Sequence, residues 1–469
     1  TALNGNYTTT ITSANTTNSA ITIDASTTGT NASVVGMEIE SSSPVVFAVT
    51  GSGGGISINT DGKNYDLITR SNIDILANGG DINLTFADGV TTDWYKSSTA
   101  YIGSKASSLV TSSSSNFTLT ADHLTWDGGA NPYIGTTGDV VWQSVSSSFG
   151  QNLDSRWFNW NQNSQTMSSL TIGRTTNTTD IYVYGLTALN NITVYGDDLY
   201  LQGDYVTSAA SGNIKLFAAT RIDSDANLTF TTGSNGKVWL ISDTDNSSGG
   251  SIYITHNLTI SSNGGEIRLA GGNFLGTGYA TGINTSYAEG VDLRGTVSIN
   301  SSNGNIIFKG KSYSDGVANS NGAWGVGFWN SSNKTINSGT GTIYIEGISQ
   351  DDNNSSYNYG VVLEGTTVQF ISANTSSDAI KIIGKNTAGD GVSYGRGISL
   401  QATTHKIHAT GSGGGITLQG EGRYGFTIYG TTEILAVSGP ITLESTNAAD
   451  GADIYINASD LDIGSKSGV

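Results

Sequence analysis

An apolar-x-apolar doublet recurs at nearly constant spacing through the second half of this 469-residue chain. The first members of successive doublets are 39, 37, 37 and 36 residues apart. Side chains alternate between the two faces of a β-strand, so both apolar residues of a doublet point the same way. The series consists of Ile267/Leu269, Ile306/Phe308, Ile343/Ile345, Ile380/Ile382 and Ile416/Leu418.

A second series of doublets is interleaved with the first, at separations of 35, 35 and 37 residues. Its middle members fall about halfway between members of the first series, which predicts a repeating unit of roughly 18 to 20 residues with one short strand each. A strand of this kind cannot bury its apolar face alone and needs a similar neighbour stacked on it. The sequence therefore predicts an all-β, parallel β-solenoid in the form of an elongated rod. The second series is Val291/Leu293, Val326/Phe328, Val361/Leu363 and Ile398/Leu400.

Two corner patterns precede the predicted strands. Gly-x-apolar-x-apolar begins, among other places, at five glycines before residue 267, and we expect each glycine to supply a corner with positive φ. Asn-apolar-Thr-apolar recurs as well, and four of its asparagines are considered as corners because asparagine tolerates left-handed geometry nearly as well. The glycines are Gly80, Gly212, Gly236, Gly250 and Gly265, and the asparagines are Asn116, Asn191, Asn227 and Asn257.

The clearest internal copy links the two ends of the chain. The segment Gly51–Ile58, GSGGGISI, returns as GSGGGITL at Gly411–Leu418. Both ends are thus built from the same unit, which predicts one continuous β-solenoid over residues 1–469. Two Trp-rich interruptions, near 126–167 and 312–330, are expected to be coils with enlarged loops, because insertions in solenoids collect in turns.

Composition fits this prediction and excludes several classes. The chain has 63 Gly, 3 Pro and only 36% hydrophobic residues, which suits a thin coiled sheet better than a wide core. Its 21 Tyr and 8 Trp argue against disorder. Cysteine is absent, which excludes disulfides and thiolate chemistry. The net charge of −18, without a basic cluster, disfavours nucleic acid as a partner, and no apolar run is long enough for a membrane span.

Neither a metal nor a cofactor is expected. His405 and His408 have a weak spacing for zinc, and surface roles are favoured. Asp243 and Asp245 lack the further ligands of a calcium loop.

Catalysis is the competing interpretation, because many β-helices cleave acidic polysaccharides with carboxylates and a basic residue on one face. The candidate pairs are adjacent in sequence, so on a strand they point to opposite faces, and in a turn they are ordinary loop residues. We therefore expect no enzyme. The candidates are Asp197 with Asp198 and Asp351 with Asp352, together with Arg268 or Lys215.

Exposed tryptophans are the better candidates for ligand binding, because a large apolar side chain in a loop is costly unless it binds something or packs over the rod. A local cap over the sheet is the alternative for the same residues. The residues are Trp142, Trp157, Trp160, Trp324 and Trp329.

The residues between the doublet members are expected to point outward. They mix aromatic and charged side chains, which excludes a regular threonine ladder for ice and leaves contact with sugars or simple stacking between neighbours. In chain order they are Lys215, Trp239, Tyr253, Arg268, Ile307, Tyr344, Lys381, Thr417 and Thr442.

The Asn-x-Thr tripeptides at five predicted strand corners match the acceptor sequence for N-glycosylation. Corner asparagines followed by an inward apolar residue and an outward threonine explain the same pattern, so both interpretations stay open. The asparagines are Asn83, Asn116, Asn191, Asn227 and Asn257.

The recurring Gly-x-Ile-x-Leu and Asn-Leu-Thr-Ile units in a Cys-free, Ser/Thr/Asn/Gly-rich chain resemble the filamentous haemagglutinin-like exoproteins, including the high-molecular-weight adhesins of two-partner secretion. The resemblance is one of repeat style and covers essentially the whole chain. It implies a right-handed parallel β-helix, an outer-membrane secretion partner and an extracellular or bacterial cell-surface location. Some members carry glycans at Asn-x-Ser/Thr. An Asn-Pro-Asn secretion signature and an Arg-Gly-Asp tripeptide are not found, so we expect a middle segment or a processed subunit.

Taken together, the sequence predicts a non-catalytic, structural and adhesive shaft of a surface fibre or secreted adhesin. Its partners would be a host or neighbouring-cell surface glycan or protein, or copies of itself stacked end to end, because a solenoid terminus is an unpaired sheet edge. The alternative is a polysaccharide-cleaving enzyme or a carbohydrate-binding, tailspike-like protein on the same fold. A group of carboxylates on one face would favour that alternative.

Overall fold

The computed structural model describes residues 2–3, 9–27, 34–87, 91–246, 249–314, 323–350, 358–387, 395–446 and 453–465. They belong to two compact units, unit 1 from Thr1 to Asp197 and unit 2 from Asp198 to Val469. Within each unit the strands pair in parallel with strands one coil away, so each unit is a parallel β-helix, as the sequence predicts. The described residues contain no α-helix, and two short 3₁₀ turns, η1 (Ser155–Trp157) and η2 (Gln162–Ser164), are the only helical elements among them.

Unit 1 has three stacks of parallel strands, and successive strands along the chain enter the stacks in turn. The first holds β1 (Ala2–Leu3), β4 (Val35–Ile39), β7 (Tyr65–Thr69), β10 (Thr92–Lys96) and β13 (Leu124–Trp126). The second holds β2 (Thr9–Ser13), β5 (Val45–Val49), β8 (Ile73–Ala77), β11 (Ala100–Gly103) and β14 (Tyr133–Ile134). The third holds β3 (Ile21–Ser26), β6 (Ile56–Asp61), β9 (Ile82–Phe86), β12 (Phe117–Thr120), β15 (Val140–Gln143), β17 (Ser169–Ile172) and the start of β20 (Asn191–Thr207). Outside these stacks lie β16 (Leu153–Asp154), β18 (Ile181–Tyr184) and β19 (Thr187–Ala188).

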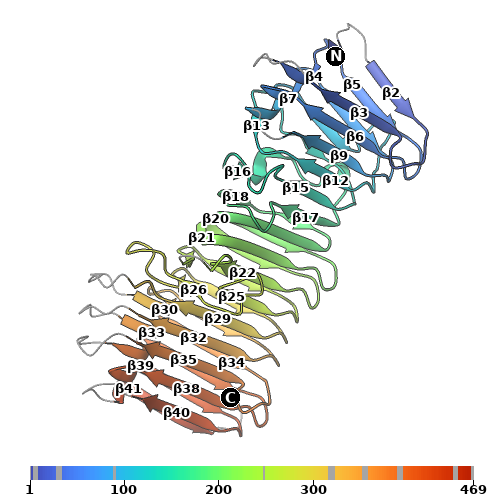
Figure 1. Ribbon diagram of the computed structural model, residues 1–469. Coiled ribbons are helices and arrows are strands. Elements are labelled where there is room, and N and C mark those ends of the chain that lie inside the picture. The colour runs from blue at the N-terminus through green and yellow to red at the C-terminus, as the bar shows by residue number, and fades with distance from the viewer. Residues whose placement is uncertain are drawn as a thin grey trace. The chain divides into compact units, whose positions relative to one another are not determined.

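Unit 2 also has three stacks, named sheets 1, 2 and 3 (Figure 1). Sheet 1 holds the start of β21 (Ile214–Thr231), β22 (Val238–Ser242), β25 (Ile267–Gly271), β29 (Ile306–Lys311), β32 (Ile343–Ser349), β35 (Ile380–Asn386), β38 (Ile416–Glu421) and β40 (Ile441–Thr446). Sheet 2 holds the middle of β21, β23 (Ile252–Ile254), β27 (Val291–Leu293), β30 (Ala323–Phe328), β33 (Asn358–Leu363), β36 (Arg396–Leu400) and the starts of β39 (Tyr424–Ala436) and β41 (Ile454–Ser465). Sheet 3 holds the end of β21, β24 (Leu258–Ser261), β28 (Val297–Asn300), β31 (Lys334–Asn337), β34 (Thr367–Ser372), β37 (Thr404–Ala409) and the ends of β39 and β41. β26 (Ala280–Thr281) pairs with the end of β29.

The core consists of columns of aliphatic side chains that run through each stack. Ile343 pairs with Ile306 on one side and with Ile380 on the other, and all three are fully buried. β32 alternates buried and half-buried residues along its whole length, as expected for a strand with one face toward the core. Burial of these apolar side chains stabilises the stack, at roughly 25 cal/mol for each Å² removed from water.

The register corrects the predicted repeating unit. Ile343 pairs with Ile380, and Ile380 with Ile416, at separations of 37 and 36 residues. The second doublet series forms its own stack in sheet 2, where Val326 pairs with Val361. The prediction of one strand per 18 to 20 residues is therefore wrong. One coil contains a strand in each of three sheets, and the two series lie in different sheets of the same coil.

Sheet 3 is only partly visible in the sequence: Leu228/Phe230 and Leu258/Ile260 belong to the predicted Asn-apolar-Thr-apolar pattern, but other inward positions hold polar residues. Lys334 pairs with Val368, and Val368 with His405, in a column that faces the core. Lys334 and His405 are both fully buried. The series of apolar doublets is therefore interrupted in sheet 3 where a buried lysine or histidine takes an inward position.

The corner glycines are required because the backbone of the adjacent coil lies against them, and not because they have a positive φ. None of the five predicted corner glycines has a positive φ; that conformation falls on the residue before each one. A Cβ at Gly236 would overlap the carbonyl oxygen of Gly212, and one at Gly265 would overlap that of Gly236. The expected positive φ is therefore wrong, and the glycine is needed because adjacent coils touch through their backbones. The positive-φ residues are Gly79, Ser211, Asn235, Gly249 and Gly264.

The repeated GSGGG segment folds identically in both units. Gly53 and Gly413 each have a φ of 83°. The N–H of Gly54 donates to Gly51 O at 3.1 Å, and the N–H of Gly414 donates to Gly411 O at 3.0 Å. The same local sequence thus forms the same turn in unit 1 and in unit 2.

Candidate functional site

The tryptophans of the first interruption pack largely as an extension of the core. Trp142 lies on β15 and is 1% exposed, with its ring centroid 5.1 Å from that of Phe158 and 6.0 Å from that of Trp157. Trp157 and Trp160 are half-buried, and the indole N–H of Trp160 donates to Ser155 O at 2.9 Å. This arrangement matches the alternative of a local cap better than an open ligand platform.

The tryptophans of the second interruption lie on the outward face of sheet 2. Trp324 stacks on Trp329 with ring centroids 4.7 Å apart and an interplanar angle of 22°. Trp324 is only 2% exposed because it also packs against Tyr359 and Val362. Trp329 is half-buried and leaves part of its surface accessible. Residues 315–322 of this interruption lie outside the described part of the chain.

Trp324 begins a column of large side chains across sheet 2. It pairs with Tyr359, which pairs with Arg396, which pairs with Tyr424. The side chains of Trp324 and Arg396 both lie along the outward face toward a residue three positions further on. The indole of Trp324 lies over Gly327, and Nη1 of Arg396 donates to Ser399 Oγ. The structure therefore places one predicted tryptophan in a row with an arginine and two tyrosines that the sequence analysis did not single out.

An acidic group lies beside this column. The Asp292 carboxylate accepts from Arg294 Nε at 2.7 Å, and Glu289 lies 3.5 Å from Arg294 Nη2. Burial raises the pKa of Glu289 and of Asp292, and the guanidinium of Arg294 opposes this rise. The Asp292 side chain is 0% exposed and that of Glu289 is 7% exposed, so a substrate in solvent does not reach these carboxylates in this conformation.

The outward positions of sheet 1 form the predicted column. Lys215 pairs with Trp239, Trp239 with Arg268, and the register continues through Tyr344 to Thr442. Tyr253 is the exception, because it lies in sheet 2 opposite Asp292. The cationic groups of Lys215 and Arg268 lie 4.9 and 5.3 Å from the centroid of Trp239, at distances typical of cation–π contacts.

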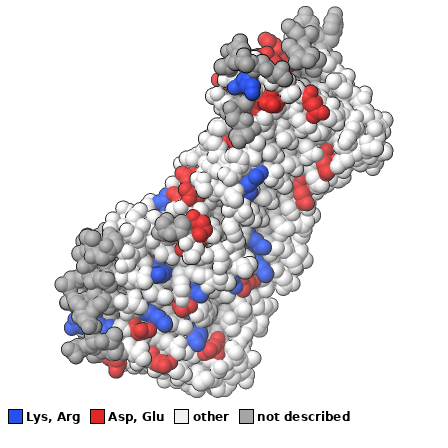
Figure 2. All heavy atoms as spheres, in the orientation of Figure 1, with Lys and Arg blue, Asp and Glu red and all other residues white. Residues whose placement is uncertain are grey.

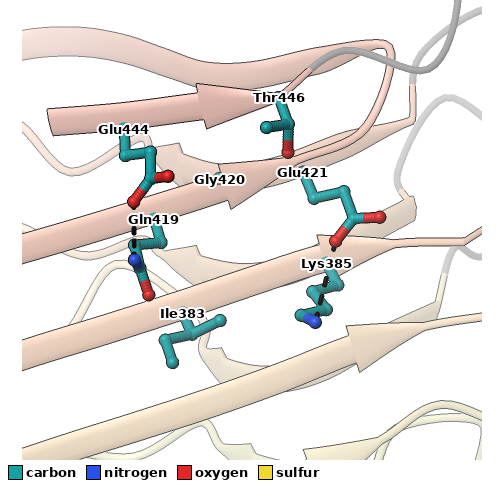
Figure 3. A pocket seen from close by; sticks show the side chains of 7 residues that line it. All are labelled: Ile383, Lys385, Gln419, Gly420, Glu421, Glu444 and Thr446. Atoms are coloured by element: carbon teal, nitrogen blue, oxygen red, sulfur yellow. Dashed lines mark hydrogen bonds and ion pairs between the residues drawn. The ribbon is translucent and has the colours of Figure 1, made fainter.

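A shallow groove lies further along the outward face of sheet 1, on β35, β38 and β40 (Figure 3). Its volume is about 190 Å³. On one side Gln419 Nε2 donates to Glu444 at 2.6 Å, and on the other Lys385 Nζ lies 3.7 Å from Glu421. The remaining lining residues are Ile383, Gly420 and Thr446.

The side chains of this groove suit binding better than acid–base chemistry. Glu444 and Glu421 come from neighbouring coils and each already interacts with a polar partner. Sugar hydroxyls can exchange hydrogen bonds with such amide, ammonium and carboxylate groups, and strand-borne side chains hold them at a fixed spacing.

The predicted catalytic candidates do not come together. Asp198 forms an ion pair with Arg221 at 2.8 Å in unit 2. Asp351 and Asp352 lie outside the described residues. Arg268 and Lys215 do meet at Trp239, but the carboxylate beside Arg268 is Glu266, at 3.0 Å.

The predicted glycosylation sites lie on the outside of their coils, and three of them are exposed. Asn227 Oδ1 accepts from the N–H of Asn257 at 3.1 Å, and Asn257 Oδ1 accepts from the N–H of Thr296 at 2.9 Å. Asn116 Oδ1 accepts from the N–H of Asp139 at 3.0 Å. None of these three has a positive φ, so the expected left-handed corner is wrong: the amide oxygen joins adjacent coils instead. Asn83 and Asn191 are half-buried.

Across the described ranges, no group of three or more His, Asp or Glu side chains is arranged to hold a metal ion. None of the helical segments described is long and apolar enough to cross a membrane. In the view of Figure 2, Lys and Arg are scattered among neutral and acidic residues and form no continuous basic area.

Comparison with known proteins gives no match to a family model, to a curated protein or to a solved structure.

Proposed function

We propose that this chain is a non-catalytic, structural and adhesive shaft of an extracellular fibre or secreted adhesin, and that its outward sheet faces contact surface glycans. The single observation that carries the proposal is the groove in Figure 3. It is open, polar and set on a regular sheet face, and the two carboxylates in it already interact with Lys385 and Gln419. These properties support a contact surface for a polymer.

The same proposal includes location and partners. Extracellular or bacterial cell-surface placement, an outer-membrane secretion partner and glycosylation at Asn-x-Thr follow from the resemblance in repeat style. End-to-end association of copies belongs to the same proposal on the general ground that the terminal coil of a solenoid has an unpaired sheet edge.

The test compares two lysine variants on a surface that displays glycans. The chain is passed over an array of bacterial and animal surface polysaccharides, and adhesion is measured for Lys385→Ala and for Lys381→Ala. Both lysines lie on β35 and pair with an acid, but only Lys385 lines the groove. We expect retention of the wild type and of Lys381→Ala and a clear loss for Lys385→Ala. Equal retention of all three, or of none, contradicts the proposal.

A polysaccharide-cleaving enzyme is the second candidate, and the observation behind it is the acidic group at Glu289 and Asp292, which share Arg294. A raised carboxyl pKa is what a general acid needs, but both carboxylates are buried, so catalysis would require the side chains over them to move aside for the substrate. Incubation with acidic polysaccharides, followed by size separation of the products, decides between the two. Release of oligosaccharides that Glu289→Gln abolishes establishes the enzyme and removes the shaft proposal.

A further inference from the structure

A second cavity, of about 200 Å³, opens on the outward face of sheet 2. It lies on β36, β39 and β41, at the continuation of the column that begins with Trp324. Its lining consists of one arginine, one threonine and three tyrosines: Arg396, Thr427, Tyr424, Tyr429 and Tyr455.

Arg396 has no carboxylate partner among the described residues. Its Nη1 donates to Tyr359 OH at 3.0 Å and, more weakly, to Ser399 Oγ at 3.5 Å, and its Nη2 lies 3.5 Å from Tyr429 OH. Its Nε is buried and has no acceptor in the described chain. A guanidinium carries five N–H donors in a planar fork, and the three hydrogen bonds leave two of them, the Nε–H and one Nη2–H, without an acceptor among the described residues.

Most of the arginines of this chain pair with an acid, although Arg174 donates instead to the carbonyl oxygen of Ser144. The arginines Arg70, Arg156, Arg221, Arg268 and Arg294 each form an ion pair with a carboxylate. The partners of Arg396 are instead hydroxyl groups, which hold the guanidinium in place without neutralising it.

The tyrosines supply the remaining walls of the cavity. The guanidinium lies 5.2 Å from the ring centroid of Tyr359 and 5.8 Å from that of Tyr429. The ring of Tyr455 lies 6.3 Å from Tyr424 and 6.0 Å from Tyr429, and Tyr455 is 42% exposed at the rim. Aromatic faces of this kind pack against the C–H faces of a sugar ring, and their hydroxyls bond to its hydroxyl groups.

We propose that this cavity binds one carboxylate-bearing sugar residue of an acidic polysaccharide, with the carboxylate on Arg396 and the sugar ring against Tyr455. This deepens the proposed function and rests on it, because it names the glycan class that an adhesive shaft would hold. Arginine fits a planar carboxylate through two parallel N–H···O bonds. The net charge of −18 does not prevent this, because charges beyond about 8 Å are screened at physiological salt.

Binding to a uronic-acid oligosaccharide and to its neutral counterpart of the same linkage tests the proposal. Both are titrated into the whole 469-residue chain by calorimetry, at two salt concentrations. We expect the acidic oligosaccharide to bind at least tenfold more tightly than the neutral one, and its affinity to fall as salt rises. Equal affinity for the two, or no affinity for the acidic one, overturns the proposal.

Variants locate the binding in this cavity. Arg396→Gln is expected to weaken binding of the acidic oligosaccharide about tenfold or more, the loss typical of a hydrogen bond to a charged group. Tyr455→Ala removes an exposed side chain and is expected to weaken both oligosaccharides together. Arg70→Gln, an exposed arginine already paired with Glu38, is the matched control and should bind as the wild type does. Unchanged affinity in both cavity variants, with unchanged melting temperatures, overturns the proposal.

The two proposals fail in different ways. Failure of the shaft proposal appears as an absence of glycan adhesion or as release of oligosaccharides. Failure of the cavity proposal alone appears as glycan binding with equal affinity for the acidic and the neutral oligosaccharide, or with an affinity that Arg396→Gln leaves unchanged.

Discussion

Gly304 lies so close to Gly265 on the adjacent coil that a Cβ added to it would overlap the carbonyl oxygen of Gly265. The relationship continues to Gly341, whose added Cβ would overlap the carbonyl oxygen of Gly304. The coils of sheet 1 are therefore in backbone contact at this corner. Any side chain at these positions separates two coils.

Replacing Gly304 with alanine should destabilise unit 2 by about 1–3 kcal/mol or more, because overpacking against backbone cannot be relieved by a side-chain rotation. The measurement is the midpoint of chemical unfolding. Gly464→Ala is the matched control, since a Cβ there meets nothing within 4 Å. Equal effects of the two substitutions would show that the coils do not touch at Gly304.

Replacing Lys334 with methionine should also destabilise unit 2. The ammonium group donates to Arg294 O at 3.0 Å and to Ser332 Oγ at 2.5 Å, and Gly295 O accepts from it as well. Burial lowers the pKa of Lys334 to about 8. Methionine keeps the volume but leaves these acceptors unpaired, at a cost of about 1–3 kcal/mol. Exposed Lys63→Met serves as the control, and a melting temperature for Lys334→Met equal to that control would contradict the prediction.

His405 should make stability depend on pH in the mildly acidic range. Burial lowers its pKa from the ordinary 6.5 to about 4. Between these two pH values the unfolded state binds more protons than the folded state. The contribution of His405 to the free energy of unfolding is therefore fully present above about pH 6.5 and is lost as the pH falls toward 4. The loss is about 3 kcal/mol at 1.36 kcal/mol for each pKa unit.

The His405 prediction is measured as a difference between two unfolding curves. His405→Gln keeps a donor and an acceptor but cannot be protonated, so its stability should lack this part of the acid dependence. Buried acids with raised pKa act in the opposite direction: the contribution of Asp66, whose pKa burial raises to about 7, is lost as the pH rises. Parallel curves for wild type and His405→Gln between pH 4 and 6.5 would rule out the buried neutral histidine.

The stability lost on replacing a tryptophan of unit 1 with alanine should increase with the burial of that tryptophan. Trp142→Ala is expected to cost about 3–5 kcal/mol, the range for a large aromatic side chain removed from a core. Trp160 is half-buried and its indole donates one hydrogen bond, so Trp160→Ala should cost clearly less. Unfolding of the two variants, followed by tryptophan fluorescence, checks the order. A larger loss for Trp160 would mean that the first interruption is not packed as the structure has it.

Much of the fold could be predicted from local patterns. Ile267, Ile306 and Ile343 stand in one column because their doublets return at the coil period, and Lys215, Trp239 and Arg268 point outward from the positions between. These features depend only on the alternation of side chains along a strand. The number of strands in a coil could not be predicted in this way, because an inward doublet looks the same in sheet 1 and in sheet 2.

The candidate binding residues were the least predictable part. Arg396 and Tyr424 are 28 residues apart and meet only because the register pairs them. Their spacing resembles no motif, and the nearest signal in the sequence was Trp324, two coils away. Even the corner glycines were identified for the wrong reason, since a contact between coils leaves no trace in the local sequence.

The amino-acid sequence by itself determined that this chain forms short strands whose apolar faces must stack in parallel coils. A short strand cannot bury the two apolar side chains of a doublet alone, so it needs an equivalent strand stacked on it. Only the tertiary structure decided which strands share a sheet, which glycines bear the contact between coils, and which side chains gather around Arg396. Those outcomes depend on the lengths of the turns between strands, and the turn lengths set the register that brings distant residues together.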